Sequence, residues 1–416
     1  MDSNHLSKYK NISIILMALW VPCWLYDDLM IKLGISVEIG RLLGVINLLG
    51  IAVYFGMVPK LDKTQKTLIF LYGVMIYYLV FLMFVYWGTG YSTVGEISRV
   101  ITGILFFMLL NDARFDFKSF INIFIYFGFF FALLSVIAFL DKFSGINMIS
   151  YSSSSHRDMA WFSFFGYTGG VYQIGNIMRV QSFWSEPARF AQFLIFPLSL
   201  IYTKYLSTKN RKHLFMMLVM LVALLTTFSV AVLSALTLVF IIYFAFRKVR
   251  GTSVSQTIYR RLAYLTMSAG LIVSVYYLYQ YTNNESGKTN VMGKETDVAF
   301  VDRFERFNIA LSVLETSSFG DRSFTKKFGS NPTVYGTALI YGGIPYLVIA
   351  LLYSMVFYIP LLKRVWRSQY KFIFLGSLAY FIAFSWYGLF TENFYFFQMA
   401  LLTTIINYEQ NDKQFI

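Results

Sequence analysis

The chain contains a single cysteine, Cys23, among 416 residues. One cysteine excludes any disulfide within the chain. Charged residues are also scarce, at 13% of the chain, whereas hydrophobic residues make up 57%. A water-soluble protein of this length needs far more charge on its surface. The composition therefore predicts an integral membrane protein.

Histidine is nearly absent as well, with only His5, His156 and His213. Neither the histidines nor the carboxylates show metal-ligand spacing, so we expect no metal and no cofactor. The formal net charge is +14, which in a soluble protein would suggest a nucleic-acid partner. Here the positive residues gather in short connections between apolar segments. We therefore interpret the charge as a topology signal and expect no nucleic acid to bind.

Apolar segments long enough to cross a bilayer, about 20 residues each, recur along the whole chain. They lie near residues 11–27, 38–59, 67–87, 94–110, 118–140, 187–205, 213–228, 230–246, 261–281, 337–361, 371–388 and 393–408. The sequence has no repeat and no soluble domain. It predicts an all-α polytopic protein in which residues 1–416 form one membrane domain with about twelve transmembrane helices.

Basic residues occupy every second connection between these segments. The clusters are Lys60/Lys63/Lys66, Arg114/Lys118, Lys204/Lys209/Arg211/Lys212, Arg247/Lys248/Arg250/Arg260/Arg261 and Lys363/Arg364/Arg367/Lys371. By the positive-inside rule these connections are cytoplasmic, and both chain termini lie on the same side.

Two segments decide whether the number of transmembrane crossings is even. Residues 213–246 form one apolar run between two basic clusters, so the run must cross twice, with a tight turn near residues 226–229. Residues 159–176 must not cross. Three glycines in that segment (Gly166, Gly169 and Gly170) weaken a helix, and we interpret the segment as interfacial or re-entrant.

Two connections on the non-cytoplasmic side are long, residues 141–186 and 282–336. Both carry basic residues, although the positive-inside rule predicts few of them on this side. We therefore expect the chemistry of the protein in these two loops.

The first loop ends in Arg179-Val-Gln-Ser-Phe-Trp-Ser-Glu-Pro-Ala-Arg-Phe-Ala191. Glu186-Pro187 predicts a helix start, because proline fits the first turn of a helix. Arg189 then faces the positive end of the helix dipole, where an anion would compensate it. We interpret Arg179 and Arg189 as a pyrophosphate clamp with Glu186 beside it. The structural alternative is an interfacial anchor in which Glu186 and Arg189 pair one turn apart.

The second loop contains Asp302-Arg303-Phe-Glu305-Arg306-Phe307, whose spacing places both arginines on one helical face. Arg303 or Arg306 is a candidate second donor to the same anion, and an amphipathic surface helix is the alternative. Further secondary candidates in the second loop and near the ends of spans are Arg322, Asn331, Tyr335, Arg41 and Arg99. Arg41 and Arg99 each follow a glutamate by one turn (Glu38 and Glu96), so internal pairing would also explain them.

These motifs resemble those of the O-antigen polymerase family. The shared elements are Arg-x-x-Ser-x-x-x-Glu-Pro-x-x-x-Ala opening a helix, and a later loop that runs from arginine through Phe-Gly and Asn to Tyr-Gly-Gly. Relatives often carry Ser-Arg between the seventh and eighth spans, whereas this chain has Ser229-Val230. The related O-antigen ligases carry a histidine near the end of the second loop, and this chain has none there.

The resemblance implies a bacterial inner-membrane glycosyltransferase that polymerises undecaprenyl-pyrophosphate-linked repeat units at the periplasmic face. Donor and acceptor would both be lipid-linked glycans in the bilayer, and a chain-length regulator protein is a candidate partner. Glu186 and Arg179 would be catalytic, with Arg189 and Arg303 or Arg306 on the pyrophosphate. A lipid-linked oligosaccharide flippase or other transporter, an O-antigen ligase and an envelope scaffold remain open alternatives.

Overall fold

A computed structural model describes most of the helical part of the chain. The described residues are 59–85, 94–112, 115–144, 151–154, 159–164, 167–174, 177–182, 187–246, 310–315, 317–321, 333–365, 370–385 and 393–410, with short pieces at 46, 49–50, 53, 56, 261, 290–291, 294–295 and 368.

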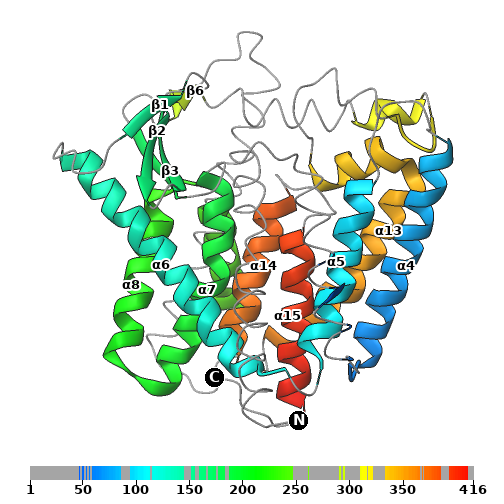
Figure 1. Ribbon diagram of the computed structural model, residues 1–416, viewed down its shortest axis with the longest axis horizontal. Coiled ribbons are helices and arrows are strands. Elements are labelled where there is room, and N and C mark those ends of the chain that lie inside the picture. The colour runs from blue at the N-terminus through cyan, green and yellow to red at the C-terminus, as the bar shows by residue number, and fades with distance from the viewer. Residues whose placement is uncertain are drawn as a thin grey trace.

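The described chain is built mainly of long apolar helices. They are α4 (Lys63–Val85), α5 (Val94–Leu110), α6 (Phe117–Ser144), α7 (Pro187–Thr208), α8 (Arg211–Thr226), α9 (Val230–Phe246), α13 (Val334–Val365), α14 (Lys371–Ser385) and α15 (Asn393–Gln410). In Figure 1, α14 and α15 occupy the middle of the bundle, with α6, α7 and α8 on one side and α4, α5 and α13 on the other. The packing agrees, since α14 contacts α7, α9 and α13, and α15 contacts α5.

Three helical stretches are long and apolar enough to cross a membrane: Lys63–Val85, Phe117–Asp141 and Val334–Leu362. α4 shows what such a helix exposes. Leu68, Tyr72 and Met75 face the core with no exposed surface, while Phe70 and Tyr77 are 69% and 78% exposed. An outward face this apolar matches lipid rather than water. The prediction of an α-helical membrane protein is confirmed at this level.

Most of the predicted apolar segments coincide with helices. α5 occupies residues 94–110 as predicted, and the segments near 67–87, 118–140, 187–205, 371–388 and 393–408 each match one helix. The segment 337–361 lies within α13, but that helix is broken at Gly343. Of the predicted spans 11–27, 38–59 and 261–281, the structure describes only residues 46, 49–50, 53, 56, 59 and 261.

The predicted turn in the run 213–246 is confirmed. α8 ends at Thr226 and α9 begins at Val230, and Phe228 between them has a positive φ of 45°. Thr227 and Ser229 in this turn are buried. The two helices then take different main neighbours, since α8 packs on α6 and α7 whereas α9 packs mainly on α14, with a smaller contact to α7.

The first long loop contains an antiparallel sheet, which the sequence analysis did not predict, so residues 159–164 and 167–174 are strands and not a crossing helix. Its strands are β1 (Tyr151–Ser154), β2 (Met159–Phe164), β3 (Tyr167–Ile174) and β4 (Ile177–Ser182), paired in that order. A short hairpin, β5 (Asn290–Val291) with β6 (Lys294–Glu295), lies in the second loop.

The register explains why a glycine-containing segment forms strands. Gly169 and Gly170 of β3 pair with Phe162 and Trp161 of β2. Aromatic residues opposite glycines compensate for the missing side chain and favour a sheet. Only two residues separate β2 from β3 and β3 from β4, which suits tight hairpins.

The bundle has two distinct ends. The sheet lies at one end, which we call the sheet end, together with the first residues of α7 (Figure 1). At the opposite end lie the starts of α4 and α6, the α7–α8 connection and the start of α14 (Figure 1). That end carries members of four of the five predicted cytoplasmic clusters, and we call it the basic end. Those at this end whose side chains the structure describes are Lys60, Lys63, Lys66, Lys118, Lys204, Lys209, Arg211, Lys212 and Lys371.

Candidate functional site

Arg179 lies where the sheet meets the helix bundle. It is a residue of β4, and its backbone pairs with that of Tyr172 on β3. β4 packs against α6 and α7. The next residue, Val180, has no exposed surface. Burial of Val180 fixes the strand against the bundle and so holds the Arg179 backbone near the beginning of α7.

The predicted helix start after Glu186 is confirmed, since α7 begins at Pro187. Proline suits this position because the first backbone N–H groups of a helix have no partner within the helix. Arg189 lies in the first turn, is half-buried, and has no acidic residue in that turn with it. Glu186 itself lies outside the described residues. β4 and α7 thus bring the backbones of two of the predicted arginines to the same region of the sheet end.

One turn further along α7, Gln192 places an amide in the core. Only 4% of Gln192 is exposed, and its Nε2 has no hydrogen-bond partner among the residues described. Gln398 on α15 is similar, with 2% exposed and no partner for either amide atom in the same part of the chain. Buried amides without partners are costly in an apolar interior. The sequence analysis missed both residues, although each is a lone amide in a strongly apolar segment.

The second candidate element, Tyr335, lies on a helix that is broken. Gly343 of α13 has non-helical torsions (φ 65°, ψ −157°) and divides the helix into Val334–Gly342 and a longer second part. The hydroxyl of Tyr335 lies beside that of Ser354. In a straight helix these residues would be about 28 Å apart, at 1.5 Å per residue. The first part of α13 therefore bends back toward the second.

The end of the second loop fills this break. The N–H of Ile344, freed from the helix, donates to the carbonyl oxygen of Ser318 at 3.0 Å. Tyr78 of α4 donates its hydroxyl to the carbonyl of Gly342 at 2.5 Å. Gly320 approaches α13 so closely that a Cβ there would lie 2.6 Å from the carbonyl oxygen of Ile340. The two glycine motifs of the sequence analysis thus meet, as a loop seated in a helix break.

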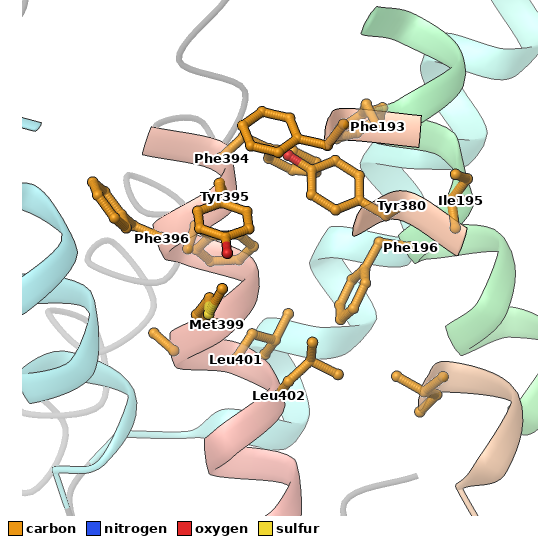
Figure 2. Close-up of a cluster of buried hydrophobic side chains, with 14 of the residues drawn as sticks. Phe193, Ile195, Phe196, Tyr380, Phe394, Tyr395, Phe396, Met399, Leu401 and Leu402 are labelled. Atoms are coloured by element: carbon orange, nitrogen blue, oxygen red, sulfur yellow. The ribbon is translucent and has the colours of Figure 1, made fainter. Parts of the chain in front are cut away.

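Aromatic residues of α14 and α15 connect the two elements (Figure 2). Phe193 of α7 contacts Phe394 of α15, with ring centroids 5.8 Å apart, and Phe394 contacts Tyr380 of α14 at 5.5 Å. The contacts continue through Phe384 to Tyr395 at 5.4 and 4.9 Å.

On the far side, the Tyr395 hydroxyl lies beside that of Ser354. Ser354 is also the residue that Tyr335 reaches. A continuous series of aromatic contacts, completed by Ser354, therefore connects the first turns of α7 with the first turn of α13.

Arg99 is the remaining predicted arginine that the structure describes as part of a helix. It is half-buried in the first part of α5, one turn after the buried Glu96. Arg41, Arg303, Arg306, Arg322 and Asn331 lie outside the described residues. Convergence of the second-loop arginines on Arg179 therefore stays a prediction.

The described side chains at the sheet end are of kinds that bind phosphate and sugars. Within the ranges given above, no three His, Cys, Asp or Glu side chains come together as metal ligands. The sheet end instead offers guanidinium groups, buried amides and tyrosine hydroxyls. Guanidinium binds phosphate oxygens in pairs, and amides and hydroxyls bind sugar hydroxyls. No protein-family model, curated protein or solved structure matches this chain.

Proposed function

We propose that this protein is a membrane glycosyltransferase that joins undecaprenyl-pyrophosphate-linked oligosaccharide units into O-antigen or a similar surface polysaccharide. It would cross the inner membrane about twelve times, with both termini in the cytoplasm and the reaction at the periplasmic face. The observation that carries the proposal is the packing of β4, which bears Arg179, against α7, whose first turn bears Arg189.

The reaction transfers a growing glycan from its lipid carrier to a new unit. A sugar hydroxyl oxygen of the acceptor attacks the anomeric carbon of the donor, and the bond from that carbon to the pyrophosphate oxygen breaks. The electron pair of that bond leaves with the undecaprenyl pyrophosphate. Glu186 accepts the proton of the attacking hydroxyl.

Arginines stabilise the leaving group in this mechanism. Negative charge develops on the departing pyrophosphate, and Arg179, Arg189 and Arg303 or Arg306 would offset it. Fixed charges in a site from which water is excluded contribute several kcal/mol to such a step. The membrane location also suits the substrate, because a polyprenyl chain stays in the bilayer while its head group reaches the surface.

Substitutions of the first element test the site. We expect Arg179→Ala and Glu186→Ala each to reduce chain growth by about 100- to 1,000-fold, as removal of one charge-stabilising group does elsewhere. Arg179→Lys should also fail, since an ammonium does not replace a two-pronged donor. The measurement is glycan length on gels from cells that carry each variant at equal membrane level.

Two comparisons complete this test. Arg303→Ala and Arg306→Ala should differ, with only one abolishing chain growth. Normal long-chain glycan from Arg179→Ala or Glu186→Ala would contradict the assigned site.

A flippase for lipid-linked oligosaccharides is the second candidate, and one observation favours it. Transporters place broken helices at their binding sites, and α13 is broken at Gly343. Deletion of the gene distinguishes the candidates. Loss of a polymerase leaves surface lipopolysaccharide with a single repeat, loss of a flippase leaves none, and loss of a ligase leaves polymer on its carrier lipid.

A further inference from the structure

At the basic end, α6, α7 and α8 pack against one another, and each of them carries a lysine there. These lysines are Lys118 of α6, Lys204 of α7 and Lys212 of α8, and we call them the lysine cluster. The charges of Lys118 and Lys212 both act unfavourably on the charge of Lys204. Like charges held together cost free energy unless an anion offsets them.

The hydrogen-bond partners of Lys204 and Lys212 are neutral. The ammonium of Lys204 donates to Oδ1 of Asn122. That of Lys212 donates to the hydroxyl of Tyr126 at 3.1 Å and lies 5.1 Å from the centroid of its ring. No ion pair with a carboxylate is formed by any of the three lysines in the described chain. The positive charge of the cluster is therefore uncompensated by these side chains.

The beginning of α8 adds to the same positive field. Asn210 caps this helix by accepting a hydrogen bond from the Lys212 N–H at 2.8 Å. Its first turn contains Arg211, Lys212 and His213 and no acidic residue. The first turn of a helix favours negative charge, so Arg211 and Lys212 oppose the helix dipole. An anion beside them would satisfy both the dipole and the lysines.

An exposed apolar strip adjoins the lysine cluster. Tyr126 and Phe130 of α6 and Phe215 and Leu218 of α8 are each between 44% and 57% exposed. A ring contact between Phe129 and Phe215, with centroids 6.0 Å apart, joins the two helices along this strip. Charge and apolar surface are thus arranged in the order of a phospholipid, with the head group at the helix ends and the acyl chains beside the helices.

We infer that the lysine cluster binds the phosphate of an anionic phospholipid whose acyl chains lie along α6 and α8. A free phosphate would use only the charges, whereas a phospholipid uses both the charges and the adjoining strip. Basic groups between transmembrane helices at a bilayer surface recognise anionic head groups in this way. The inference requires only membrane insertion and is independent of the proposed glycosyl transfer.

The test uses the full-length protein in detergent and native mass spectrometry with phosphatidylglycerol or phosphatidylcholine. We expect the wild type to retain phosphatidylglycerol in preference. The variant Lys118→Gln/Lys204→Gln/Lys212→Gln should lose this preference, at about fivefold weaker binding for each lysine removed. A matched control, Lys60→Gln/Lys63→Gln/Lys66→Gln, removes three exposed lysines from the same end and should leave the preference unchanged.

Two further arms keep the inference falsifiable. Lys204 is half-buried, so the double variant Lys118→Gln/Lys212→Gln, at two exposed positions, tests the site if the triple variant fails to fold. Inorganic phosphate should not displace the bound lipid. Equal retention of both lipids by the wild type, equal loss in the control variant, or displacement by phosphate alone would each overturn the inference.

Discussion

Gly343 occupies a backbone position that residues with a side chain avoid. Its φ is 65°, and a Cβ there would collide with the carbonyl oxygen of Ser318. Gly320, on the opposite side of the same contact, has a φ of 86°. Glycine pays no steric penalty in this region of backbone torsions, whereas other residues do. The contact between the second loop and α13 therefore depends on glycine at both positions.

We expect Gly343→Ala to lower the free energy of unfolding by about 1–2 kcal/mol from the backbone alone, and further through displacement of Ser318. Gly73→Ala is the matched control, because it lies in the interior of α4 and no atom lies within 4 Å of an added Cβ. Alanine there should stabilise the helix by about 1 kcal/mol. Thermal unfolding of the detergent-solubilised protein measures both changes. Equal midpoints for the two variants would mean that the contact does not hold the helix break.

The sequence located single residues well only where local chemistry decides their place. Pro187 begins α7 as predicted, and Arg189 follows in its first turn, since both positions depend on helix-end geometry alone. The neighbour of Tyr335 was beyond prediction. Ser354 reaches it only because α13 bends at Gly343, and a bend set by a loop seated in the helix leaves no local pattern.

At the scale of elements, apolar length was enough to find helices but not strands. The turn between α8 and α9 followed from charge parity and lies where expected. The sheet at 151–182 was missed because its apolar residues and glycines were judged only as evidence for or against a helix. Strand pairing such as that of Trp161 with Gly170 depends on how the strands align in the folded protein. Composition does not reveal that alignment.

The seating of the second loop in α13 can be tested by cross-linking. In a Cys23→Ser background, Ser318→Cys and Ile344→Cys should form a disulfide under mild oxidation. Their backbones share a hydrogen bond of 3.0 Å, which places the Cα atoms within the range that a disulfide bridges. Each single-cysteine variant is the control. Absence of the cross-link in folded protein would show that the loop is not seated in the helix break.

At the scale of the molecule, one end of the bundle is basic and the other carries the sheet and the starts of α7 and α13 (Figure 1). Described lysines and arginines from four of the five predicted cytoplasmic clusters belong to the basic end. This separation gives the predicted orientation a physical basis, since basic residues resist translocation. It also keeps the lysine cluster and the Arg179 region at opposite ends of the bundle.

Reporter fusions test this orientation. Truncations fused after Asn210 or Val365 should place an attached reporter in the cytoplasm, and a fusion after Ser154 should place it outside. Alkaline phosphatase is active only after export. Green fluorescent protein fluoresces in the cytoplasm but not after export by the general secretion route, so the two reporters give opposite readouts. Phosphatase activity from the Asn210 fusion would contradict the two-sided arrangement.

The separate neighbours of α8 and α9 set an order for assembly during synthesis. α8 packs on helices already made, α6 and α7, whereas α9 packs mainly on α14, whose residues 371–385 are translated much later. α9 must therefore wait for its main packing partner with only a small contact to α7 in place. Its uniformly apolar sequence, without a charged residue from Val230 to Phe246, makes that wait tolerable in the bilayer.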